Sequence, residues 1–170
     1  MQHKTLDNLG CPLARSLDQM GEWWSILILR EAFMGIRRFD DFQTRLGIAP
    51  NILTRRLKAL VDGGVLERRP YQDRPQRFEY CLTAKGRDFQ SVILALVAWG
   101  NRWLAPEGVA VQPVDRRTGE EVEPVLIDGR TGNRLGWGDV RIMPGPAAGE
   151  ALRRHLCPPP PRSTRQETSS

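Results

Sequence analysis

The sequence has few residues able to form a disulfide framework or hold a metal. Its 170 residues include three cysteines (Cys11, Cys81 and Cys157) and two histidines, with no C-x-x-C pair. An odd and sparse set of cysteines is not typical of a disulfide-stapled domain. None of these residues are paired at the spacing of zinc ligands. We therefore expect neither a structural disulfide nor a bound metal or cofactor.

The sequence also lacks the features of membrane proteins and of the common enzyme classes. Its longest apolar run, near residues 23–29, is interrupted by Ser25 and ends at Arg30, well short of the roughly 20 residues of a membrane span. The N-terminus leads into no apolar signal core. No glycine-rich phosphate loop or nucleophile elbow is present. These absences predict a cytoplasmic protein that has no membrane partner and is not an enzyme.

Positive charge is concentrated in the first part of the chain. The net charge is +5, and residues 1–105 hold 16 Lys and Arg against 11 Asp and Glu, so the remaining residues are balanced. A basic module favours a polyanionic partner, and nucleic acid is the first candidate.

Hydrophobic periodicity predicts four helices in the first 62 residues. They cover residues 12–20, 23–34, 38–46 and 50–62, and the second is apolar on most sides, which indicates burial. Gly47-Ile48-Ala49 separates the short third helix from the longer fourth. A short helix, a turn with glycine and a longer helix form the helix-turn-helix pattern.

A hairpin and a long helix follow. Residues 65–69 and 77–82 alternate as strands, and residues 70–75 form the loop between them, which predicts a wing. Thr83 then caps a helix that runs to about Leu104. The expected fold class is therefore α+β, with an N-terminal arm at 1–10 and a winged helix-turn-helix domain at 11–105.

From Pro106 the composition changes, and we expect a small β-rich appendage over residues 106–157. Asp115-Arg116-Arg117-Thr118-Gly119 is repeated as Asp128-Gly129-Arg130-Thr131-Gly132, 13 residues later, and each reads as a tight turn. Strands are expected near residues 122–127 and 140–143. Residues 158–170 begin with four prolines and are expected to be disordered.

The fourth helix has a polar face suited to the major groove. Leu53, Leu57 and Leu60 share the opposite, inward face. Arg pairs bidentately with guanine and Asn with adenine, and the N-terminal half of a recognition helix reaches the bases. We expect base contacts from Asn51, Thr54 and Arg55, and contacts nearer phosphate from Arg56, Lys58 and the helix start at Arg38. The wing is expected to make a minor-groove or phosphate contact through Arg74 and Arg77, and Pro50 is also expected at the DNA interface. The alternative is a solvated polar face on a winged helix that binds proteins without DNA.

In order along the chain, these residues resemble the HxlR-type winged-helix regulators, relatives of MarR. The match covers about residues 11–103 and includes Cys11-Pro12-Leu13, Gly21, Trp24, residues 27–31, Gly35, Arg38-Phe39, Ile48, Pro50, Leu53, Arg56-Leu57-Lys58, Leu60, Gly64-Val65-Leu66, Arg68, Pro75, Glu79-Tyr80, Leu82-Thr83, Lys85-Gly86 and Trp99-Gly100. The resemblance implies a dimeric regulator, which we expect to be a repressor, bound to a palindromic operator in double-stranded DNA.

The resemblance also implies that the first and fifth helices form the dimer interface. The fifth helix carries a long apolar stripe that one small core would not cover. The expected interface residues are Leu13, Leu17, Ile93, Leu96, Trp99 and Trp103.

The chain departs from the family pattern at two places. Glu22-Trp23 stands where the family has Gly-Lys, so we assign no DNA contact there. Some members end in a zinc-ribbon-like module, whereas here the turns have Asp and Thr in place of the paired cysteines. Asp and Thr do not replace thiolates in structural zinc sites. The appendage is either a degenerate ribbon without metal or two ordinary β-turns.

Cys11 matches the position of a redox-sensing cysteine in several relatives. A thiol at a helix N-terminus is favoured as thiolate, and Arg15 adds positive charge one turn later. We expect the effector to be an oxidant acting on Cys11 or a small molecule held near the fifth helix. The alternative is that Cys11 only packs. Cys81, in a strand, is expected to be buried and inert, and Cys157 to be exposed.

Overall fold

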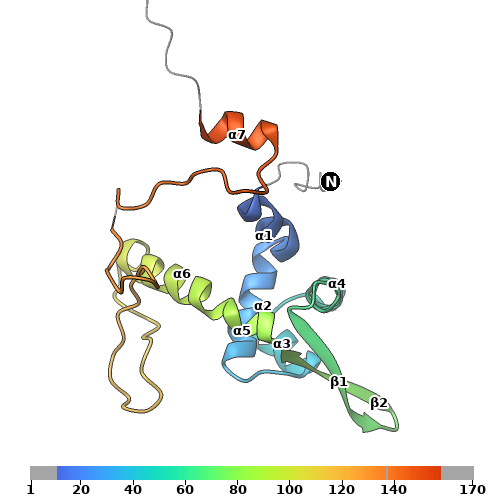
Figure 1. Cartoon of the computed structure of the whole chain (residues 1–170). Coiled ribbons are helices and arrows are strands. Elements are labelled where there is room, and N and C mark those ends of the chain that lie inside the picture. Colours follow the sequence, from blue (N-terminus) through green and yellow to red (C-terminus); the bar gives the residue numbers. More distant parts are fainter. Residues whose placement is uncertain (1–10, 137, 158–170) are drawn as a thin grey trace, which may run out of the picture. The chain divides into compact units, whose positions relative to one another are not determined.

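The computed structural model describes residues 11–136 and 138–157 (Figure 1). These residues divide into two units: the larger is Gln19–Leu135, and the smaller contains the described residues up to Asp18 and from Gly136 to Cys157. The predicted arm at 1–10 and the predicted tail at 158–170 lie outside the described residues. No helix in the described ranges is long and apolar enough to cross a membrane.

The larger unit is built on three helices in the predicted order. They are α2 (Trp23–Phe33), α3 (Phe39–Leu46) and α4 (Pro50–Asp62), and the bounds of α4 agree with the prediction. Pro50 starts α4 because its fixed φ suits the first helical position, where an N–H has no partner in any case. Gly47 ends α3 with φ +60°, in the left-handed region that glycine adopts without strain. The predicted helix-turn-helix is thus confirmed.

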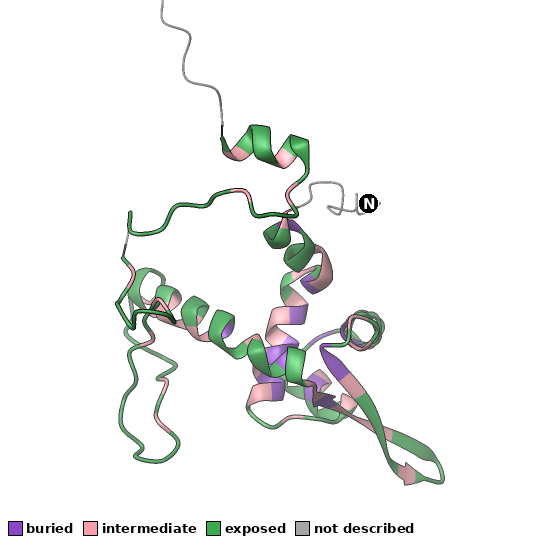
Figure 2. Cartoon of the chain, viewed as in Figure 1, coloured by how far each residue is buried: buried purple, intermediate pink, exposed green. Residues whose placement is uncertain are grey.

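One hydrophobic core joins these helices to the base of the wing (Figure 2). α2 is buried on several sides, as predicted, and α3 contributes Phe42. The inward face predicted for α4 is confirmed, because Leu53, Leu57 and Leu60 have no exposed surface. The core is completed by Met20, Ile28, Leu29, Ala32, Ile48, Val65, Leu66 and Ile93.

The wing is an antiparallel hairpin of β1 (Leu66–Asp73) and β2 (Gln76–Leu82). Its strands are longer than predicted, and the expected loop at 70–75 is wrong: only Arg74 and Pro75 separate the strands. The sequence predicts that the first strand ends before Pro70, but Pro70 lies in β1 beside a register shift in a two-stranded ribbon. At such a position a missing ladder N–H is tolerated.

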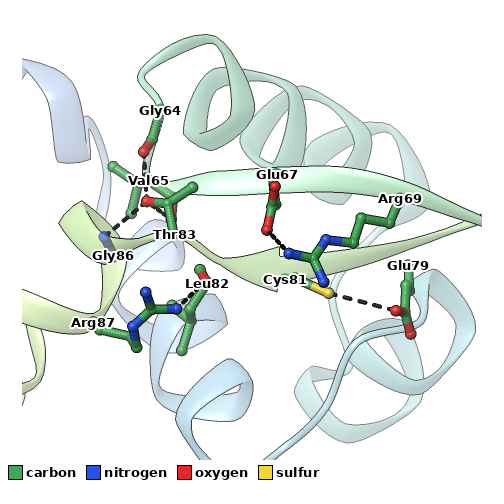
Figure 3. Close-up of polar contacts among 10 residues, drawn as sticks. All are labelled: Gly64, Val65, Glu67, Arg69, Glu79, Cys81, Leu82, Thr83, Gly86 and Arg87. Carbon is green, nitrogen blue, oxygen red and sulfur yellow. Dashed lines mark hydrogen bonds and ion pairs between the residues drawn. The ribbon is translucent and has the colours of Figure 1, made fainter.

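Thr83 fastens the base of the wing to the next helix (Figure 3). Its hydroxyl accepts from the N–H of Gly86 at 3.1 Å and donates to the carbonyl of Gly64 at 2.7 Å. Gly86 packs so closely that an added Cβ would lie 2.2 Å from the carbonyl oxygen of Val65. The cap predicted at Thr83 is confirmed, and Gly86 is required by close approach rather than by an unusual φ.

The single helix predicted from Thr83 to Leu104 is wrong in one respect, because it is divided. Phe89 separates α5 (Ala84–Asp88) from α6 (Gln90–Trp103). The backbone of Phe89 itself is near-helical, with φ −69° and ψ −10°. Hydrophobic spacing continues across this turn, so periodicity alone did not reveal the break.

Residues 106–135 form two tight turns rather than a sheet. Gly119 and Gly132 close these turns with φ +75° and +73°, as the repeated motif predicts. Single bridges join Val114 to Glu121 and Ile127 to Arg134. The strands predicted at 122–127 and 140–143 are wrong: in the described part of the chain, neither forms. Each turn closes its own short segment, so alternating residues there have no neighbouring strand to pair with.

The smaller unit contains the first residues of α1 (Pro12–Met20) and a helix that we did not predict, α7 (Glu150–Leu156). The bounds of α1 agree with the prediction, and the amide of Arg15 donates to the carbonyl of Cys11 at 3.1 Å. In α7, Glu150 lies in the first turn and three basic residues lie in the last, a placement that suits the helix dipole. The proline and glycine residues that precede α7 favour a loop, so the sequence does not predict this short helix.

Candidate nucleic-acid interface

The polar face of α4 is open to solvent. Asn51, Thr54, Arg55 and Lys58 are exposed on the side opposite the buried leucines. The Thr54 hydroxyl donates to the carbonyl of Pro50 at 2.8 Å, and Asn51 Oδ1 accepts from the amide of Ile52 at 2.9 Å. Lys58 pairs with Asp62 one turn later at 2.5 Å. The structure therefore brings the predicted base-reading residues onto one accessible face.

Arg56 differs from its neighbours because it turns toward the protein. Its side chain is only 11% exposed and forms an ion pair with Glu22, the residue that precedes α2. Arg55, at 61% exposed, lies 4.0 Å from the same carboxylate. The pairing of Glu22 with Arg56 is not predicted from the sequence. The departure from the family pattern at that position, where an acid replaces a small residue, is the signal that points to it.

Arg38 lies where α3 meets the wing. Its guanidinium carbon stands 4.6 Å from the ring centre of Tyr71 in β1, which is a cation–π contact. Its backbone bridges Glu79 in β2, and the amide of Tyr80 donates to the carbonyl of Arg37 at 2.8 Å. Arg38 remains an exposed residue. It therefore offers positive charge at the start of α3 and also holds the wing against that helix.

Two of the predicted cations lie at the far end of the wing. Arg74 forms the turn, where its carbonyl accepts from Gln72 Nε2 at 3.1 Å, and Arg77 is one residue into β2. Both are exposed. Closer to the base, Arg68 stacks on Phe78 at 3.4 Å from the ring centre. The wing thus displays cations along its length.

A buried carboxylate links α2 to α3. Glu31 Oε2 accepts from Arg45 Nε at 2.6 Å, and Glu31 Oε1 accepts from Arg30 Nη2 at 2.7 Å. Burial raises the pKa of Glu31, but the hydrogen bonds and charges of Arg45 and Arg30 outweigh it, so the pKa lies below its usual value. Glu31 therefore stays ionised and holds α3 in place. This cluster is not predicted from the sequence, because its members lie on two different helices.

The cysteines lie in three different environments. Cys11 is half-buried at the start of α1, and Cys157 is exposed after α7. Cys81 is buried in β2, as predicted, and burial together with nearby Glu79 raises the pKa of its thiol. Cys81 is consequently a poor nucleophile at neutral pH. Within the described ranges, no three His, Cys, Asp or Glu side chains form a group that fits a metal ion.

The predicted interface residues do not all lie on the surface. Ile93 is buried in the core of its own chain. Leu96, Trp99 and Trp103 are exposed along α6, and so are Leu13 and Leu17 on α1. The outward apolar stripe of α6 is therefore narrower than the sequence predicts, although its two tryptophans remain uncovered.

A helix-turn-helix with a two-stranded wing and an exposed polar face on its second helix defines a winged-helix DNA-binding protein. The HxlR-like helix-turn-helix family profile matches residues 19–108. The chain belongs to this family. It is accordingly a DNA-binding transcription regulator and not an enzyme.

Individual relatives agree with this assignment. The chain is 41% identical to the uncharacterized HTH-type transcriptional regulator Mb3122 of Mycobacterium bovis, across 81% of this chain and 87% of that protein. It resembles the structure of a proposed transcription factor, PA1374, of Pseudomonas aeruginosa, with 51% identity, a TM-score of 0.62, and coverage of 85% and 99%. The redox regulator HypR in its reduced form matches with 29% identity and a TM-score of 0.51, over 57% of this chain and 99% of HypR.

Proposed function

We propose that this chain acts as a homodimeric repressor that binds a palindromic operator through α4. The observation that carries the proposal is the line of Asn51, Thr54 and Arg55 on the open face of α4. Amide, hydroxyl and guanidinium groups are suited to the edges of adenine and guanine in the major groove. Their position in the first half of the helix matches the part of a recognition helix that reaches bases.

The surrounding cations serve the phosphate backbone. Pro50 sets the start of α4, Lys58 follows the base-reading residues, and Arg74 and Arg77 lie on the wing where it would meet a flanking groove. Arg38 supplies charge near the start of α3. Arg56 has a different role from the one its sequence position suggested: paired with Glu22, it orients α4 instead of contacting phosphate.

The exposed tryptophans of α6 support dimerisation. Trp99 and Trp103 are more than half exposed, as are Leu13 and Leu17 on α1. Large apolar side chains at such density are typical of a surface that another chain covers. A two-fold dimer would present two α4 helices about one DNA turn apart, which requires a palindromic site.

The regulator responds either to thiol oxidation or to a small molecule. Cys11 at the start of α1 supports the first possibility, since it is half-buried rather than enclosed. The related HypR is a redox regulator by its description. A cavity beside α6 supports the second possibility.

Genomic DNA fragments captured on the purified protein and sequenced would give the operator, and gel shifts on that operator test the reading residues. Arg55→Ala should weaken specific binding by about 1–3 kcal/mol and relax selectivity at one base position. Arg117→Ala, an exposed cation in the turn after α6, is the matched control. If Arg55→Ala discriminates operator from random duplex as well as the parent does, Arg55 does not read bases.

A further inference from the structure

A cavity of about 470 Å³ lies between α2, α3 and α6 in the larger unit. Its walls are mostly apolar and include Phe33, Leu94, Val97, Val111 and Pro113. Small-molecule sites in proteins commonly have volumes of about 300–1,000 Å³ with apolar walls and a few polar groups. Two of the helices that border the cavity, α2 and α3, belong to the winged helix-turn-helix, so a ligand bound in the cavity would contact the DNA-binding part of the chain directly.

The polar side of this cavity carries a net positive charge. Arg30, Glu31 and Arg45 all line it. Glu31 is only 3% exposed and binds both arginines, whereas Arg30 and Arg45 are 42% and 49% exposed. Two guanidinium groups facing one carboxylate leave one positive charge unbalanced at this wall.

Both guanidiniums retain unused hydrogen-bond donors. The Glu31 carboxylate accepts hydrogen bonds from Nε and Nη2 of Arg30 and from Nε of Arg45. An arginine carries five N–H donors. In the part of the chain that the structure describes, Nη1 of Arg30 and both Nη atoms of Arg45 donate to no protein acceptor. Ionised Glu31 fixes the two side chains, so these donors are held in place before any ligand arrives.

We propose that this cavity binds a small molecule that has one carboxylate and an apolar body. The carboxylate of the ligand would accept hydrogen bonds from the unused guanidinium donors. Such charge-assisted hydrogen bonds between arginine and carboxylate are stronger than neutral ones. The body would lie against Phe33, Leu94 and Val97 and remove apolar surface from water. A neutral molecule of the same shape would leave the charge of the wall unpaired.

This proposal rests on the proposed function in one respect, because it makes the ligand an effector of DNA binding. Arg45 lies in the last turn of α3, immediately before the turn that leads to α4. A carboxylate that engages the Nη donors of Arg45 would add a second anionic partner to the guanidinium that Glu31 holds through Nε. If the two states of α3 differ in this pairing, ligand binding and operator binding are coupled and each changes the affinity of the other.

The test uses the full chain and naphthalene-2-carboxylate as the probe, followed by titration calorimetry. The neutral amide of the same ring is the comparison. We expect the carboxylate to bind about tenfold or more tightly than the amide. Equal affinity for acid and amide would overturn the proposal, and so would the absence of detectable carboxylate binding.

Two variants locate the binding. Val97→Phe fills the apolar end of the cavity, and Arg45→Lys keeps the charge beside Glu31 but removes the guanidinium fork. Each should weaken carboxylate binding by about tenfold, whereas Arg117→Gln should leave it unchanged. Unchanged binding in both variants would place the ligand elsewhere and refute the site. The comparison of acid with amide on the unmodified protein holds whether or not a variant folds.

Gel shifts separate this proposal from the proposed function. Charge-selective binding of the probe to a protein that recognises no operator would leave the site standing and refute the regulator mechanism. Specific operator binding by a protein that does not prefer the acid over the amide would refute only the site. With both intact, saturating probe should change operator affinity in the parent but not in Val97→Phe.

Discussion

Glu22 forms an ion pair with Arg56, and this contact joins the residue before α2 to the middle of the recognition helix. The Arg56 side chain is almost enclosed, and its Nε has no hydrogen-bond partner among the described residues. The ion pair with the Glu22 carboxylate therefore offsets most of the free-energy cost of burying the Arg56 charge. The same carboxylate lies 4.0 Å from Arg55, so it also influences a predicted base-reading residue.

Replacing Glu22 with alanine should destabilise the protein. The free energy of unfolding should fall by about 1–3 kcal/mol, because a nearly buried guanidinium loses its charged partner. Urea denaturation of the parent, Glu22→Ala and Glu22→Gln measures the effect, and Glu67→Ala on the exposed wing pair with Arg69 is the control. An unfolding free energy equal to that of the parent would show that Arg56 does not depend on Glu22.

Gly86 should not tolerate a side chain. Alanine there would place its Cβ 2.2 Å from the carbonyl oxygen of Val65, a backbone atom that has little freedom to move. We expect Gly86→Ala to lower the free energy of unfolding by about 1–3 kcal/mol.

Gly129→Ala is the matched control, because a Cβ at that position meets nothing within 4 Å and Gly129 has no positive φ. Its unfolding free energy should stay within about 0.5 kcal/mol of the parent value. Equal stability of the two variants in thermal and urea unfolding would contradict the close packing of α5 against the base of the wing.

Stability should fall in acid through Glu31. Its pKa is lowered in the folded protein from a usual value of 4.5, so its contribution to stability is complete above that value and is lost as pH decreases through the folded-state pKa. Urea midpoints measured at decreasing pH should decline more for the parent than for Glu31→Gln, which has no carboxyl to titrate there. Parallel curves for the two proteins would show that Glu31 is not linked to Arg45 and Arg30 as described.

The tryptophans of α6 should control assembly. Sedimentation should give a dimer for the parent, and the double variant Trp99→Ala with Trp103→Ala should shift it toward monomer, because truncating aromatic anchors at a contact typically costs about 2 kcal/mol or more each. Trp23→Ala removes another exposed tryptophan outside α6 and serves as the control. A parent that remains monomeric at micromolar concentration would refute the dimer.

The sequence predicted the elements whose signals are local and strong. The leucines of α4, Pro50 and Gly47 specified the helix-turn-helix, and Thr83 marked a helix start, because periodicity, fixed φ and capping act within a few residues. The break at Phe89 and the strand that continues past Pro70 depend on how neighbouring segments pack, and α7 is too short to give a strong pattern. These features were missed for that reason.

The candidate site also contains features that the sequence predicts and features that it does not. The exposed face of α4 followed from helix geometry, so Asn51, Thr54 and Arg55 were found from spacing. The ion pairs of Glu22 with Arg56 and of Glu31 with Arg45 join residues that lie 34 and 14 positions apart in the sequence. No pattern within a single helix reveals such partners, so the sequence does not predict the ion pairs that Arg56 and Glu31 form.

Oxidation of Cys11 should alter operator binding if the thiol is the switch. Cys11 immediately precedes α1, and its carbonyl accepts the first helical hydrogen bond from the amide of Arg15. Modification there would displace α1 and, through the proposed dimer, the spacing of the two α4 helices. Because half-sites lie about one DNA turn apart, a small change in that spacing lowers affinity.

Gel shifts after treatment with diamide should show weakened binding by the parent and by Cys157→Ser, whereas Cys11→Ser should bind as the untreated parent does and ignore the oxidant. Loss of binding in Cys11→Ser after the same treatment would assign the response to another residue, and an unresponsive parent would leave the small carboxylate as the effector.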